Sequence, residues 1–154
     1  MRIAIAVLVG VVLTGCAAQQ PLMKQTASGN AEVFIPFVEP DTVREKIVGA
    51  CAQMGAAATS SMNTVVCRMQ MDGTKAALMQ ALIGNSYSTT PEDVAYFTFA
   101  WQERGTFLTL YRNVETQMAM GQVRAQKLTG SNVQNENQAA LNAILESLDP
   151  RPAE

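Results

Sequence analysis

The chain has 154 residues, of which 48% are hydrophobic and 16% are charged, with a formal net charge of −2 and no histidine. This composition is that of a globular protein and excludes a largely disordered chain. Its scattered basic residues do not form the positive surface that nucleic-acid binding needs, and without histidine neither Ser-His-Asp nor Cys-His catalysis is possible.

The N-terminus has the pattern of an export signal. Arg2 supplies a positive charge, residues 3–13 form an uncharged apolar run, and small residues precede Cys16. These are the three parts of a secretory signal peptide. The apolar run is too short for a membrane-spanning helix, which needs about 20 residues. We therefore expect residues 1–15 to be cleaved.

The tetrapeptide Leu13-Thr14-Gly15-Cys16 closely resembles the lipobox of bacterial lipoproteins. The resemblance implies a diacylglyceryl group on the Cys16 thiol, cleavage before Cys16, and a membrane anchor of two or three acyl chains. Ala17 and Ala18 follow, where an aspartate favours inner-membrane retention in this family. The resemblance thus implies an outer-membrane lipoprotein of a Gram-negative cell, facing the periplasm. The alternative is an ordinary signal peptide with an incidental cysteine.

The segment after the lipobox is mostly small or polar and shows no clear period. We predict that residues 16–31 are the lipid anchor and a flexible tether, the alternative being a first strand that starts early. Residues 32–150 are then predicted to form a single domain.

The domain is predicted to open with a strand and a helix. A β-branched and aromatic run predicts a strand over residues 32–38. Thr42 and Glu45 have the spacing of a capping box, which predicts the helix N-terminus. Gly55 suits the left-handed position that ends a helix.

Two strands and a short helix are predicted next. Alternating apolar residues predict a half-buried strand over 64–71, paired with residues 56–61 through a turn. Residues 74–83 are predicted to form a helix with an apolar core face, and residues 85–93 a polar loop. The residues of that core face are Leu78, Met79, Leu82 and Ile83.

Residues 94–102 and 106–114 form the clearest strands of the chain. We expect Gly105 to take the left-handed position of a three-residue hairpin loop. Residues 115–124 are a possible further strand, either paired within the domain or ordered by a partner. A last helix is predicted over residues 134–148.

This order of elements predicts an α+β fold. Hairpins dominate, so we expect a two-layer sandwich in which two to three helices pack on one face of a mostly antiparallel sheet of five to six strands.

Two cysteines remain beside Cys16. Because the periplasm is oxidising, we predict a disulfide between Cys51 on the first helix and Cys67 on its neighbouring strand. Two separate buried thiols and a redox-active pair are the alternatives. A redox pair usually has closer spacing, such as Cys-x-x-Cys.

Other candidate residues have a structural and a functional interpretation. The methionines could bind Cu(I), but core filling is the better interpretation, and we predict no metal or cofactor. Glu92 and Asp93 are adjacent carboxylates, which we interpret as part of a charged loop rather than a catalytic pair. Three aromatic residues could form an interaction surface, although cross-strand packing also explains aromatics in a hairpin. They are Tyr96, Trp101 and Tyr111.

These observations favour a non-catalytic, lipid-anchored accessory protein of the cell envelope. Its partners would be the membrane, through the lipid, and a protein of an assembly, secretion or conjugation complex. The working surface would be the hairpin 94–114 or a sheet edge. The alternative is a periplasmic ligand-binding, hydrolase-inhibitor or immunity lipoprotein. A catalytic version would depend on carboxylates such as Glu103 or Glu115.

Overall fold

The computed structural model describes residues 20–148. The predicted signal peptide, the lipobox and Cys16 lie outside the described residues. The elements in chain order are β1 (Ala31–Pro36), α1 (Pro40–Gln53), β2 (Ala57–Ser60), β3 (Thr64–Gln70), α2 (Gly73–Ile83), β4 (Glu92–Gln102), β5 (Gly105–Gln117), the 3-10 turn η1 (Ala119–Gly121), β6 (Val123–Lys127) and α3 (Ser131–Leu148). None of the described helices is long and apolar enough to cross a membrane.

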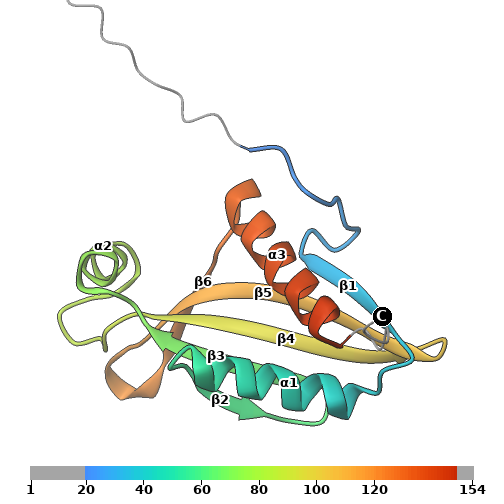
Figure 1. The fold of residues 1–154 in the computed structure, drawn as a ribbon. Helices are drawn as coiled ribbons and strands as arrows, with labels where there is room; N and C mark the ends of the chain where they lie inside the picture. The colour runs from blue at the N-terminus through green and yellow to red at the C-terminus, as the bar shows by residue number, and fades with distance from the viewer. Residues whose placement is uncertain (1–19, 149–154) are drawn as a thin grey trace, which may run out of the picture.

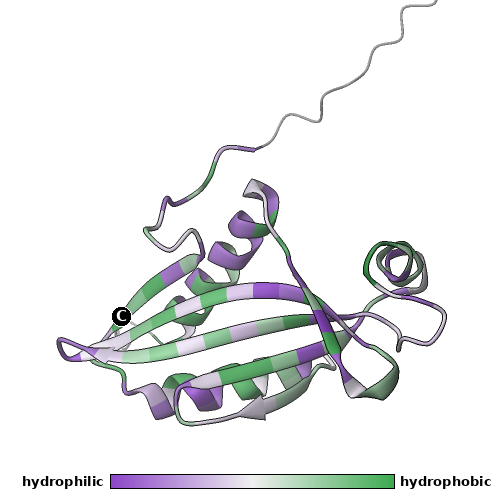
Figure 2. Cartoon of the chain, turned by 180° about the vertical axis from the view of Figure 1, so that it is seen from behind, coloured by the Kyte–Doolittle hydropathy of each residue, from purple (hydrophilic) through white to green (hydrophobic). Residues whose placement is uncertain are grey.

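The strands form one antiparallel sheet in the order β1-β5-β4-β3-β2, and β6 pairs with the second half of β5. Helices α1 and α3 cover one face of this sheet, whereas α2 lies at its end, near β5 and β6 (Figure 1). The opposite face is not covered by a described helix (Figure 2). The predicted α+β sandwich is confirmed: the sheet has six strands, and two helices cover one of its faces.

The core lies between the sheet and these two helices. The register pairs Phe97 with Leu110 and Phe99 with Leu108, and all four side chains are buried. Since side chains alternate along a strand, every second residue of β4 and β5 points to the helices and the others to the uncovered face. The helices contribute Val43, Ile47, Cys51 and Leu141.

A disulfide joins α1 to β3, as the sequence predicts. Cys51 and Cys67 are bonded, with their Cα atoms 6.0 Å apart, and both are buried. The bond therefore fixes the C-terminal half of α1 onto the sheet.

Helix α1 begins differently from the prediction. It starts at Pro40, and no side chain caps it, so the expected capping box of Thr42 and Glu45 is wrong. Proline suits the first helical position because its φ is preset and its missing N–H would have no partner there. The predicted end is correct, since Gly55 has a φ of +74°.

The β4–β5 turn is shorter than predicted. Glu103 and Arg104 have φ values of +42° and +71°, so they form a two-residue turn, and Gly105 is already in β5 opposite Gln102. A turn with two positive φ values matches the twist of the flanking strands. Gly105 is needed for another reason: a Cβ there would lie 2.5 Å from the backbone oxygen of Ile35.

Residues 115–124 are not one strand. Strand β5 continues to Gln117, η1 follows, and β6 begins at Val123 and pairs with β5 inside the domain. Residues 85–93 are likewise not all loop, because β4 starts at Glu92.

Helix α3 starts at Ser131, three residues before the predicted start. Its Gln138 accepts a hydrogen bond from the Glu32 N–H (3.3 Å) and donates one to the Glu32 carbonyl (3.2 Å). This side chain therefore satisfies backbone groups on the outer edge of β1.

The described part of the predicted tether contacts α3. Asn135 donates a hydrogen bond to the Pro21 carbonyl (2.9 Å) and accepts one from the Met23 N–H (2.7 Å). Gln134 donates a longer one to the Lys24 carbonyl (3.4 Å). Residues 21–24 thus lie along the first turns of α3, and β1 begins at Ala31.

Several residues predicted to be in the core are exposed. In α2 only Ala76 is buried, while Leu78 and Leu82 are 62% and 68% exposed. The methionines Met54, Met69 and Met120 are also exposed, so core filling does not explain them. A periodic pattern identifies an apolar face but does not say which face of a helix meets the core.

We expect the Cys51→Ala/Cys67→Ala double variant to lose about 3 kcal/mol of unfolding free energy, because the bond closes a loop with a sequence separation of 16. Urea unfolding of the two proteins measures this difference. A loss below about 1 kcal/mol would contradict the cross-linking role.

Gly105→Ala is expected to cost about 1–3 kcal/mol, because its methyl group would overlap the Ile35 carbonyl. Gly49→Ala is the matched control: nothing lies within 4 Å of a Cβ at that helical position, so it should stabilise the protein by roughly 0.5–1 kcal/mol. Equal effects of the two substitutions in thermal unfolding would show that the close approach at Gly105 is unimportant.

Candidate functional site

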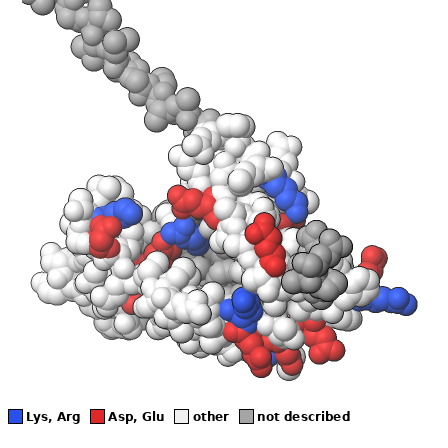
Figure 3. Space-filling model, in the orientation of Figure 1, with Lys and Arg blue, Asp and Glu red and all other residues white. Residues whose placement is uncertain are grey.

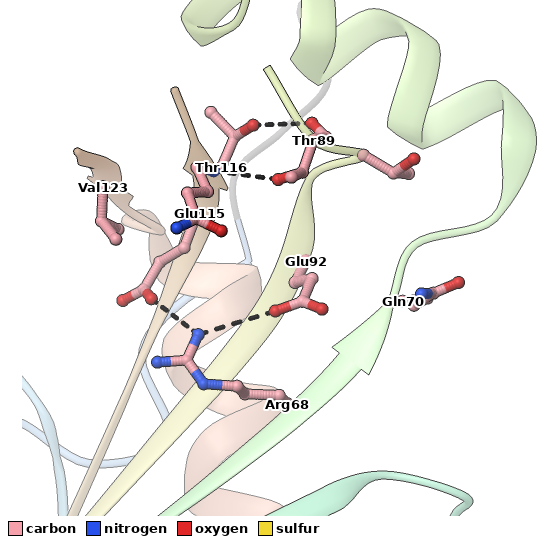
Figure 4. A pocket seen from close by; sticks show the side chains of 9 residues that line it. Arg68, Gln70, Thr89, Glu92, Glu115, Thr116 and Val123 are labelled. Atoms are coloured by element: carbon pink, nitrogen blue, oxygen red, sulfur yellow. Dashed lines mark hydrogen bonds and ion pairs between the residues drawn. The ribbon is translucent and has the colours of Figure 1, made fainter. Parts of the chain in front are cut away.

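A polar hollow lies on the uncovered face of the sheet, where β3, β4 and β5 run side by side (Figure 4). Its volume is about 480 Å³. The hollow is lined by Arg68, Gln70, Thr89, Thr90, Glu92, Glu115, Thr116, Gln117 and Val123. The strand register causes this grouping, because Gln70, Glu92 and Glu115 are cross-strand neighbours.

Arg68 is shared by two carboxylates of the hollow. Its Nη1 lies 2.9 Å from Oε2 of Glu115 and 3.6 Å from Oε2 of Glu92. Glu115 is only 6% exposed and also accepts hydrogen bonds from the Tyr96 hydroxyl and from Asn113 Nδ2 (3.5 Å). Glu115 therefore has three hydrogen-bond partners inside the protein, whereas Glu92 has one longer ion-pair contact with Arg68.

A pair of stacked tyrosines adjoins the hollow. The rings of Tyr96 and Tyr111 are nearly parallel, with centroids 5.0 Å apart. Lys127 Nζ lies 5.7 Å from the Tyr111 centroid, within the range of a cation–π interaction. A continuous row of interacting side chains thus runs from Lys127 through the tyrosines to Glu115 and Arg68.

These contacts shift the pKa of three groups. Burial by itself raises the pKa of Glu115, but the hydrogen bonds from Tyr96 and Arg68 outweigh it, and the net pKa is lowered. Burial and the hydrogen bond to Glu115 raise the pKa of Tyr96 to about 12. For Arg68, burial lowers the pKa, but the bond to Glu115 and the nearby negative charge raise it overall.

The hollow therefore holds fixed charges at neutral pH. Glu115 stays ionised and Tyr96 keeps its proton, so neither is suited to transfer a proton at that pH. The charges of Arg68, Glu92 and Glu115 sum to −1. Among residues 20–148, no group of three His, Cys, Asp or Glu side chains is placed to hold a metal ion.

The three aromatic residues proposed from the sequence do not form one surface. Tyr96 and Tyr111 lie together on the uncovered face, but Trp101 is an odd number of residues from Tyr96 on β4 and points to the other face. It is 53% exposed and borders a shallow hollow at the start of α1.

The carboxylates are also separated by the alternation of β4. Glu92 points to Arg68, whereas Asp93 pairs with Arg112, whose Nε lies 3.0 Å from its Oδ1. Both residues lie at the start of β4, so the interpretation of them as loop residues is wrong. Glu103 lies in the turn at the opposite end of β4, so it does not join Glu115.

Arg68 was not among the site residues predicted from the sequence. A signal was present, since Arg68 occupies an outward position of the alternating strand 64–71. Its partner Glu115 is 47 residues away in the sequence, and the two residues meet because β3, β4 and β5 pair side by side.

Glu115 should make stability depend on pH. Because its pKa is lower in the folded chain than in the unfolded chain (about 4.3), its stabilising effect is complete above that pH. The effect is lost as the pH falls through the folded-state pKa. We therefore expect Glu115→Gln to destabilise the protein at pH 7, and the difference from the wild type to shrink between pH 5 and pH 3.

Urea unfolding at several pH values tests this prediction, with Glu45→Gln on the exposed side of α1 as the control. A difference between wild type and Glu115→Gln that does not change with pH would refute the charged pairing.

Comparison of the chain with protein-family models, with curated proteins and with solved structures finds no match in any of the three. The chemistry of the site is therefore the basis for a functional proposal.

Proposed function

We propose that this protein is a lipid-anchored lipoprotein of the bacterial envelope that binds a basic segment of a partner protein on the uncovered face of its sheet. The observation that carries the proposal is the preformed hollow, in which Arg68, Glu92 and Glu115 combine to a net negative charge beside two stacked tyrosines.

The charge distribution favours a basic partner group. Glu115 already accepts hydrogen bonds from Tyr96, Arg68 and Asn113 inside the protein. Glu92 is about one-third exposed, and its contact with Arg68 is an ion pair of 3.6 Å. A lysine or arginine entering the hollow would find an accessible carboxylate in Glu92 and neutralise the local charge.

The tyrosine pair supports the same class of partner. Aromatic faces attract cations, and Lys127 already lies over the ring of Tyr111. Tyr96 is held by its stack and its hydrogen bond to Glu115, so little ordering would remain to be done on binding. Such rigidity is typical of a recognition surface.

The lipobox-like sequence Leu13-Thr14-Gly15-Cys16 supports the location. An anchor at Cys16 would hold the domain at the periplasmic side of the outer membrane. The absence of His from the whole sequence and the ionised state of Glu115 favour binding over catalysis. A small cationic ligand is the second candidate, because the hollow of about 480 Å³ could also enclose one.

The test is extraction of the tagged, full-length protein from its own cells in a mild detergent, followed by identification of bound proteins by mass spectrometry. We expect one partner in stoichiometric amount. Glu92→Gln should reduce its recovery about 10-fold, since an accessible charged pair contributes on the order of 1.4 kcal/mol in this setting.

Glu45→Gln, which removes an exposed charge from α1, is the control and should leave recovery unchanged. Recovery that is equal for both variants would place the binding surface elsewhere. Extraction of the protein without any partner would refute the stable complex, and a screen of small cationic ligands against the same variants would then decide the second candidate.

A further inference from the structure

Helix α2 has apolar side chains on more than one side, and two of its leucines are exposed. Its inner side, which lines a hollow against Pro91, carries Ala76, Ala77 and Gln80. One half-turn away, Leu78 and Leu82 are 62% and 68% exposed. The leucines therefore point away from the protein, whereas Ala76 is buried and Met79 and Ile83 are half-buried.

The surface around these leucines is almost free of charge. From Gly73 to Pro91, Lys75 is the only charged residue, and it pairs with Asp72 at 3.7 Å. In Figure 3, α2 is white apart from one basic and one acidic patch. Tyr87, on the loop after α2, is 81% exposed. Exposed leucines can enter the headgroup region of a bilayer, and tyrosine is enriched at the membrane–water interface.

The expected lipid anchor arrives on the same side of the sheet. Residues 21–24 are hydrogen-bonded to the first turns of α3, and in Figure 1 both α2 and the start of α3 stand above the sheet. The four residue steps from Cys16 to Gln20 span at most about 14 Å. An acylated Cys16 would therefore keep this side of the domain close to the bilayer.

We infer that α2 rests on the outer-membrane lipid surface, with Leu78 and Leu82 inserted at the level of the headgroups. This inference depends on the proposed lipid anchor. The membrane is favoured over a protein as the cover of α2 because the short tether already holds the bilayer near this face.

The test uses the full mature, lipidated protein in phosphatidylethanolamine–phosphatidylglycerol vesicles whose acyl chains are brominated. Leu78→Trp is introduced with Trp101→Phe, so that position 78 carries the only indole. We expect its emission to shift to the blue and to be quenched at least twofold by the brominated lipid. Leu82→Trp should behave in the same way.

Met62→Trp, in the same Trp101→Phe background, is the control. Met62 is 81% exposed and lies in the turn between β2 and β3, away from α2, so its replacement should be open to iodide in the water and insensitive to the lipid. An indole at position 78 that behaves like this control would overturn the inference. An indole that both iodide and brominated lipid fail to reach would also overturn it, since a protein would then cover α2.

The mass of the N-terminal peptide separates this inference from the proposed function. An unacylated Cys16 would overturn both. An acylated Cys16 together with an unquenched indole would overturn the placement of α2 alone.

Discussion

The register between β4 and β5 is the constraint on which the rest of the structure depends. All 11 residues of β4 pair with β5, from Glu92 opposite Glu115 to Gln102 opposite Gly105. This register places phenylalanines and leucines under α1 and α3, and on the other face it stacks Tyr96 on Tyr111. Because side chains alternate, a slip of one residue would bury the polar row and expose the core. The core and the candidate site are therefore specified by the same pairing.

The remaining elements are arranged around β5, which is longer than its partner. Its first half pairs with β1 and its second half with β6, and the outer edge of β1 is closed where Gln138 bonds both backbone groups of Glu32. The polar hollow forms where β5 has passed the end of β1. The fold can leave one face of the sheet uncovered because α1, α3 and the disulfide bury the apolar residues on the other face.

Much of this architecture could be predicted from local patterns. Alternation identified β3, β4 and β5, and the compartment implied by the signal sequence, with one cysteine on each apolar face, predicted the Cys51–Cys67 disulfide. The site was less accessible to prediction, because Arg68 and Glu115 meet only through the pairing of three strands. The sequence alone could have placed Tyr96 and Trp101 on opposite faces of the sheet, because they are five residues apart on one strand and side chains alternate between the faces. The orientation of α2 could not be predicted, because periodicity does not reveal which face the domain covers.

The buried charge of Glu115 is an argument for function rather than stability. A buried ion pair often contributes less than an apolar replacement of similar volume, because both groups lose their hydration. Here the charge of Glu115 lies beside the hollow, which is also lined by residues of the loop following α2. In that loop, Thr89 accepts hydrogen bonds from the Thr116 hydroxyl (2.7 Å) and the Gln117 N–H (3.0 Å). With α2 resting on the bilayer, this loop would hold the hollow close to the lipid surface. The partner segment would then be a basic stretch next to a membrane, which is a narrower class than basic proteins in general.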